Sequence, residues 1–133
     1  MSDDDTGVTV YEAAGGQPFF DDVVARFYEG VEADPVLRPL YPDDLTDSKV
    51  HLSLFLAQYW GGPTTYSEQR GHPRLRMRHV PFRIGTAERD AWVRHMAAAV
   101  RSTCDGRGTH PEVERRLLDY TESAATFLVN APD

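Results

Sequence analysis

Cysteine is almost absent from this sequence, since Cys104 is the single one among 133 residues. One thiol forms no intrachain disulfide and cannot build a cluster of thiolate metal ligands. The five histidines include no pair with the spacing of a zinc site. Any metal in this protein must therefore be bound by histidine or arrive with a cofactor.

Long hydrophobic runs are missing as well. No apolar stretch approaches the ~20 residues that a membrane-spanning helix needs, so we expect no membrane span. The first residues, Met1 to Asp5, are acidic and lack the basic start and apolar centre of a secretory signal. We therefore expect the protein to be cytoplasmic.

Positive charge is scarce, because the net charge is −7 and the sequence pI is about 5.1. A nucleic-acid-binding protein normally presents a basic face to phosphates, so we expect no nucleic-acid partner. One local exception surrounds His79, where arginines gather: Arg70, Arg74, Arg76, Arg78 and Arg83. They form either a solvated surface or a site where one or two guanidinium groups pair with carboxylates of a ligand.

What the chain does contain suits one helical domain. Hydrophobic residues make up 41% of it, too many for disorder, and 133 residues can enclose a core and one ligand. Strand patterns and internal repeats are lacking. We predict a flexible acidic tail at residues 1–8 and a single all-α domain at residues 9–133.

Four substantial helices follow from helical spacing and from glycine and proline punctuation. The first runs from Pro18 to before Asp34, with a buried stripe at Phe20, Val23, Val24, Phe27 and Val31. The second is capped by Thr46 or Asp47 and ends at residues 61–63, and the third begins after an N-cap at Thr86 and ends at residues 106–108. The fourth opens at Pro111, and its inward positions are Val113, Leu117, Tyr120, Ala124 and Phe127.

Shorter elements connect these helices. One turn or two at residues 10–14 ends at the glycine pair 15–16, and prolines fix Tyr41 in a corner. Residues 64–72 are polar, which indicates an ordered loop. Pro73 then begins a brief helix that ends at His79, and a histidine so placed can aim one ring nitrogen at a buried metal cofactor while the other meets a backbone carbonyl.

Several motifs resemble those of one known family across nearly all of residues 11–130. They are Arg26-Phe27-Tyr28, the run from Gln58 to Pro63 (QYWGGP), the run from Tyr66 to His79 (YSEQRGHPRLRMRH) and Glu88-Arg89-Asp90-Ala91-Trp92. The chain is similar to the truncated haemoglobins, specifically their group II branch. This resemblance implies a shortened globin fold, a 2-on-2 helical sandwich around haem b (protoporphyrin IX with iron).

The resemblance also implies roles for individual residues. His79 matches the proximal ligand that supplies the fifth bond to iron, with its other nitrogen oriented by a carbonyl. Tyr28 matches the tyrosine that faces the sixth coordination position, and Trp92 matches an indole N–H aimed into the same distal pocket. Tyr41 adds a third donor, while Ser48 lies near the position of the usual distal histidine.

The remaining cofactor contacts are expected around this centre. Leu52 and Phe55 wall the distal pocket, Arg78 with Tyr66 receives the propionates, and further contacts come from Met77, Phe82, Ile84 and Met96. For the apolar members of this set, ordinary core packing is the alternative explanation.

Two well-aimed donors are expected to slow oxygen release by two orders of magnitude, since a hydrogen bond to a charged acceptor contributes about 1.5–3 kcal/mol. The function we predict is reversible, high-affinity binding of O2, NO, CO or other small haem ligands, without assigned catalytic residues. A redox enzyme with peroxidase or nitric oxide dioxygenase activity is one alternative, and a helical interaction module without cofactor is another. An external reductase and self-association into a homo-oligomer stay open.

Overall fold

A computed structural model describes residues 8–132 of the chain. Residues 1–7 of the predicted acidic tail and Asp133 lie outside the described residues, so the domain boundaries stay a prediction. The described part is helical, as predicted. Its helices are α2 (Val10–Ala14), α3 (Gln17–Ala33), α4 (Thr46–Tyr59), α5 (Thr65–Arg70), α6 (Leu75–His79), α7 (Thr86–Arg107) and α8 (Pro111–Phe127), with a 3-10 turn at Arg38–Leu40.

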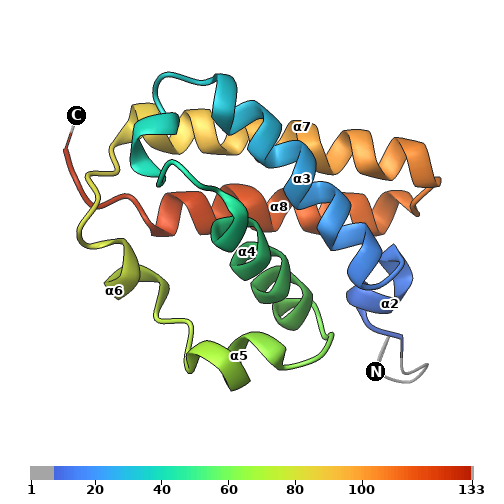
Figure 1. Cartoon of the computed structure of the whole chain (residues 1–133). Helices are drawn as coiled ribbons and strands as arrows, with labels where there is room; N and C mark the ends of the chain where they lie inside the picture. Colours follow the sequence, from blue (N-terminus) through green and yellow to red (C-terminus); the bar gives the residue numbers. More distant parts are fainter. Residues whose placement is uncertain (1–7, 133) are drawn as a thin grey trace.

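Two pairs of long helices make up the fold (Figure 1). Helix α3 packs against α7 and α4, and α7 packs against α8. In the figure, α7 and α8 run side by side, while α3 and α4 cross over them and α5 and α6 extend below. The four substantial helices of the predicted 2-on-2 sandwich are therefore present, and the short helices leave one end of it open.

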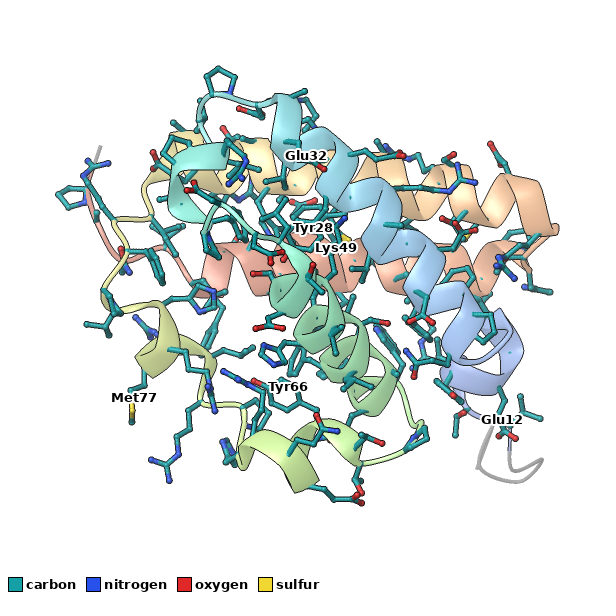
Figure 2. All side chains as sticks on the ribbon, in the orientation of Figure 1. Glu12, Tyr28, Glu32, Lys49, Tyr66 and Met77 are labelled. Carbon is teal, nitrogen blue, oxygen red and sulfur yellow. The ribbon has the colours of Figure 1, made fainter. Side chains whose placement is uncertain are left out.

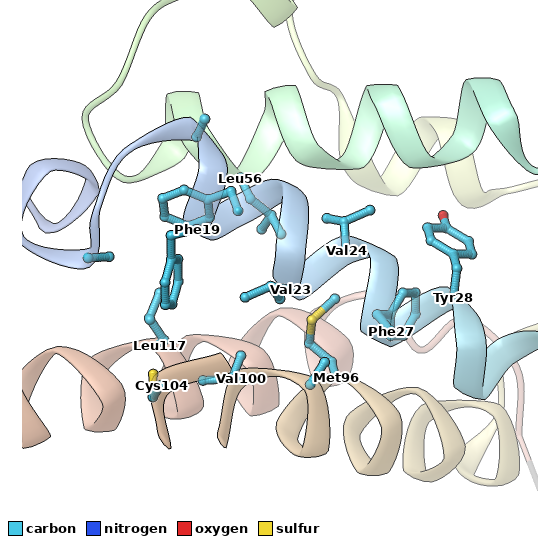
Figure 3. Close-up of a cluster of buried hydrophobic side chains, with 14 of the residues drawn as sticks. Phe19, Val23, Val24, Phe27, Tyr28, Leu56, Met96, Val100, Cys104 and Leu117 are labelled. Atoms are coloured by element: carbon cyan, nitrogen blue, oxygen red, sulfur yellow. The ribbon is translucent and has the colours of Figure 1, made fainter. Parts of the chain in front are cut away.

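The core lies between α3 and the α7–α8 pair (Figure 3). The stripe predicted for α3, which includes Phe20, Val24 and Phe27, is buried throughout. Burial of each such side chain contributes about 1.5–3 kcal/mol. This packing holds α3 rigidly and so fixes Tyr28, which follows Phe27 at the edge of the core.

The inward stripe of α8 differs from the prediction. Val113 and Leu117 are buried, but the stripe continues through Thr121 and Ala125, and Phe127 is exposed. The Thr121 hydroxyl donates to the carbonyl of Leu117 at 2.9 Å, which removes the penalty for burying it. Of the other predicted inward residues, Tyr120 is partly buried against the core and Ala124 is half-buried, whereas the placement of Phe127 was wrong.

Glycines allow α2 to pack against the end of α4. The backbone N–H of Tyr11 donates to the carbonyl of Trp60 at 3.0 Å. A Cβ on Gly62 would lie 2.6 Å from the Tyr11 ring and 2.8 Å from the Ala57 carbonyl oxygen. A side chain at this position would therefore separate α2 from α4.

Helix starts differ from the predictions in three places. Helix α4 begins at Thr46, whose N–H donates to the Asp44 carboxylate at 2.9 Å, so neither predicted residue is the cap. Helix α7 has Gly85 as its N-cap in place of Thr86, and the Gly85 N–H donates to the Glu88 carboxylate.

The third difference concerns the segment before His79. Residues predicted as a loop include the helix α5, and α6 begins at Leu75, two residues beyond the predicted Pro73. Arg74 precedes it in the left-handed region, at φ 47°. Among the described helices, none is long and apolar enough to cross a bilayer.

Candidate functional site

A cavity of about 370 Å³ opens at the end of the sandwich where α5 and α6 lie. This volume falls in the usual range of small-molecule sites, roughly 300–1,000 Å³. Most of its wall is apolar, and it collects residues from α3, α4, α5, α6, α7 and α8. Of the predicted site residues, those that line it are Tyr28, Tyr41, Leu52, Phe55, Tyr66, Arg78, His79, Phe82, Ile84 and Trp92.

His79 ends α6 with its ring at the cavity wall. Its Nδ1 lies 2.6 Å from the carbonyl oxygen of Leu75, one turn earlier. A carbonyl only accepts, so Nδ1 carries the hydrogen, and in the neutral imidazole this leaves the lone pair on Nε2. This arrangement, which the sequence analysis expected, is the one that orients an imidazole as a metal ligand.

Asn130 holds the segment that follows His79. Its side-chain N–H2 donates to the carbonyls of His79 and Phe82, at 3.2 and 2.9 Å. Its side-chain oxygen accepts from the N–H of Ile84 at 2.8 Å. One amide beyond α8 therefore fixes the loop between α6 and α7, a role that the sequence analysis did not predict.

Three polar aromatic side chains meet on the opposite side of the cavity. The rings of Tyr28 and Tyr41 pack edge to face, with centroids 5.5 Å apart. Trp92 packs against Phe27, the neighbour of Tyr28, at 5.5 Å. Tyr28 is only 3% exposed, so its hydroxyl depends on partners inside the protein.

These hydroxyls stay protonated, and the side chains that act on their pKa, Ser48 and Trp92, also line the cavity. Burial raises the pKa of Tyr28 far above its usual range, against a hydrogen bond from Ser48 that lowers it. Burial likewise raises the pKa of Tyr41 to about 12, and the Trp92 indole opposes this by donating to its oxygen. A phenol that accepts such a hydrogen bond keeps its own proton as a donor for a molecule in the cavity.

Cationic side chains form the rim between α4, α5 and α6. The Arg78 guanidinium donates to the carbonyls of Pro73 (2.7 Å) and Arg70 (3.0 Å), which ties α5 to α6. Arg70 in turn lies 3.3 Å from Nε2 of His51. The sequence had assigned this rim to Arg78 and Tyr66, and the structure adds Arg70 and His51 to the lining.

The two remaining predicted site residues lie elsewhere. Met77 is exposed, and Figure 2 shows it projecting away from the helices. Met96 is buried in the core between α3 and α7 and borders a second, much smaller cavity (Figure 3). Contacts that the sequence did not suggest come instead from Leu37, Leu75, Ala125 and Leu128.

The chemistry of this donor set fits a flat apolar cofactor with carboxylate arms. One imidazole with a free Nε2 faces the cavity, apolar walls surround it, and arginines stand at the rim. Together these features define a helical protein that encloses a porphyrin between one histidine and a group of hydrogen-bond donors.

Comparison with known proteins agrees with this class. The family model for bacterial-like globin matches residues 9–127. Group 2 truncated hemoglobin YjbI of Bacillus subtilis (strain 168) is 40% identical over 120 residues, which is 90% of this chain and 87% of that protein.

Solved structures of other haemoglobins are similar to this chain as well. A thermostable hemoglobin from the actinobacterium Thermobifida fusca has a TM-score of 0.89 at 54% identity, covering 95% of this chain and 100% of that one. The group II truncated hemoglobin of Bacillus anthracis has a TM-score of 0.88 at 37% identity, covering 95% and 99%.

The chain belongs to the bacterial-like globin family, within the group II truncated haemoglobins. Its cofactor is haem b, and its ligands are dioxygen and related diatomic molecules. The resemblance recognised in the sequence is confirmed for the fold, the cofactor and the ligand class.

Proposed function

We propose that this globin holds dioxygen with high affinity and releases it slowly. The observation that carries the proposal is the pair of phenol donors formed by the buried Tyr28 and the partly buried Tyr41, with Trp92 as the partner of Tyr41. Haem b, when bound, supplies the ferrous iron at which a diatomic ligand binds and becomes partly negative. All other interactions with the ligand come from the side chains that line the cavity.

His79 is the residue proposed to hold the cofactor on the proximal side, because its Nε2 is free and its Nδ1 is fixed by Leu75. Arg78 and Arg70 are proposed to pair with the carboxylate arms at the rim. The apolar walls at Leu52, Phe55 and Phe82 keep water out and strengthen each hydrogen bond made inside the cavity.

On the distal side, the donors act in series. We propose that Ser48 donates to Tyr28 and that the single N–H of Trp92 donates to Tyr41, since the hydrogen bond of each partner lowers the pKa of its tyrosine. Each hydroxyl polarised in this way is a stronger donor toward the ligand. A ligand that gains negative charge, such as dioxygen, is retained, whereas a neutral one benefits less.

Reaction of held oxygen with nitric oxide, or activation of peroxide, is the second candidate function. The hydroxyls of Tyr28 and Tyr41 favour this second function, because such donors can polarise an O–O bond. Either activity requires an electron donor, and we propose that a separate reductase supplies the electrons. We place this function in the cytoplasm, as expected from the sequence.

The optical spectrum of the haem-reconstituted protein tests the proposal. Wild type and the control His72→Gln, which changes a histidine outside the cavity, should retain a five-coordinate ferrous haem and form a stable oxygenated species. His79→Gly should lose the iron bond and recover it when imidazole is added. The proposal would be overturned if all three proteins failed to retain haem. It would also be overturned if wild type released oxygen as fast as a Tyr28→Phe/Tyr41→Phe variant.

A further inference from the structure

A second surface of interest lies on the outer side of α6. Residues 69–87 contain five arginines and no aspartate or glutamate, so the rest of the chain carries a net charge of −12 against −7 for the whole. Arg74 and Arg76 are exposed, and no carboxylate among residues 8–132 pairs with either. Arg83 is different, since it contacts Glu88 at 3.8 Å.

Exposed apolar side chains stand beside these two arginines. Met77 is 59% exposed, Val80 71% and Phe127 54%, and none of the three lines the cavity. The Arg76 guanidinium lies 5.1 Å from the centre of the Phe127 ring, which joins α6 to the end of α8. We call these five residues (Arg74, Arg76, Met77, Val80 and Phe127) the α6 surface.

The α6 surface is directly connected to the haem pocket. Met77 lies two residues before His79 and Val80 directly follows it; both side chains are exposed, while the His79 ring lines the cavity. Phe82 also borders the cavity, with its ring centroid 6.4 Å from that of His79. The α6 surface therefore shares one short helix and the loop after it with the two aromatic rings that border the cavity.

The composition of the α6 surface favours a protein partner. Apolar centres with methionine and phenylalanine, bordered by arginine, are typical of protein–protein interfaces. A nucleic acid or phosphate ligand would use the arginines but would leave Met77, Val80 and Phe127 without a role. Because the remaining surface is acidic, an acidic partner is repelled elsewhere and oriented toward α6.

We propose that the α6 surface is the docking site of a small acidic electron-transfer protein, of the ferredoxin or flavodoxin class. The inference rests on the proposed function, which needs ferrous iron. The donor loses one electron and the ferric iron in the pocket gains it, with no transfer of atoms or protons. Arg74 and Arg76 contact the donor's carboxylates, while Met77, Val80 and Phe127 pack against its apolar centre.

The test uses the haem-loaded ferric protein with two probes, a plant-type [2Fe–2S] ferredoxin and a flavodoxin. Binding is measured by isothermal titration, and the rate of reduction by the reduced probe is measured by stopped flow at low and high salt. The variant Arg74→Gln/Arg76→Gln is compared with Arg101→Gln/Arg115→Gln, which removes the same charge from the exposed faces of α7 and α8. Met77→Ser examines the apolar contact.

At least one probe should bind wild type, with a rate of reduction that falls as salt rises. Arg74→Gln/Arg76→Gln should lower affinity and rate about fivefold to tenfold at low salt, whereas the control stays within twofold of wild type. Met77→Ser should weaken binding about threefold or more without changing the salt dependence.

Three results would overturn the docking site. The first is that neither probe binds. The second is that the two double variants lower the rate of reduction equally. The third is that duplex DNA or phosphatidylserine vesicles bind through the same arginines while the probes do not bind. The haem spectrum and carbon monoxide binding of each variant are recorded in parallel. Normal spectra with no docking refute this inference alone, whereas absent haem refutes the proposed function beneath it.

Discussion

Removal of the Tyr28 hydroxyl is expected to accelerate oxygen release strongly. The ring packs between Phe27 and Tyr41, with centroids 5.0 and 5.5 Å away. Phenylalanine preserves both contacts, so Tyr28→Phe deletes one hydrogen-bond donor and little else.

The size of the effect follows from the charge of the acceptor. A hydrogen bond to a charged group contributes about 1.5–3 kcal/mol. Since ~1.4 kcal/mol corresponds to a factor of ten, oxygen dissociation should become about 10- to 150-fold faster. Ser48→Ala leaves the Tyr28 hydroxyl in place but removes its polarising partner, and we expect a smaller acceleration of about twofold to fivefold.

Stopped-flow mixing of the oxygenated protein with carbon monoxide measures this rate. Tyr59→Phe is the matched control, because Tyr59 is exposed and does not line the cavity. Carbon monoxide gains little negative charge, so its own dissociation should change less than threefold. If Tyr28→Phe released oxygen within twofold of the wild-type rate while its haem spectrum stayed unchanged, the donor role of Tyr28 would be refuted.

Three further predictions concern stability, measured by urea unfolding. Gly30→Ala should lower the free energy of unfolding despite the better helix propensity of alanine, because its Cβ would lie 2.4 Å from Nδ1 of His95, and His95 is held by Asp34 at 2.6 Å. Overpacking of this kind costs about 1–3 kcal/mol; an unchanged midpoint would show that His95 moves aside freely. Met96→Ala should cost about 2–5 kcal/mol because Met96 is buried, whereas Met77→Ala should change stability by less than about 0.5 kcal/mol because Met77 is exposed; equal losses would contradict the assignment of Met96 to the core. Finally, the hydrogen bond from His95 lowers the pKa of Asp34. The contribution of this carboxylate to the free energy of unfolding is therefore complete above its unfolded-state pKa of about 3.9, and it is lost as pH falls through the lower folded-state pKa. Asp34→Asn should therefore flatten the loss of stability below about pH 4, and identical acid profiles would refute this linkage.

The sequence predicted best where packing repeats over a long helix. The buried stripe of α3 was predicted correctly because large apolar residues occupy its inward positions. Their helical spacing is therefore compatible with only one buried face. In α8 two readings compete, since a buried Thr121 looks polar and an exposed Phe127 looks apolar. The spacing alone could not show that the Thr121 hydroxyl is satisfied by the Leu117 carbonyl.

Short elements were harder to predict. Helix α5 buries only Tyr66, so no periodicity marks it, and its polar sequence suggested a loop. The proximal role of His79 was expected and its Nδ1 contact is present, but the role itself stays a prediction until the variants are measured. Arg70 and His51 could not be placed at the rim from sequence, because their proximity depends on how α5 turns back toward α4.

Asn130 has a consequence for the order in which the pocket is assembled. During synthesis, α3 and α4 with Tyr28 leave the ribosome well before the residues that close the cavity from the other side. The loop after His79 gains its side-chain anchor only when Asn130 has also been made and has bonded to the carbonyls of His79 and Phe82. A nascent chain that lacks Asn130 therefore presents His79 on a loop without this anchor, and we expect the pocket to retain haem firmly only once Asn130 has been added.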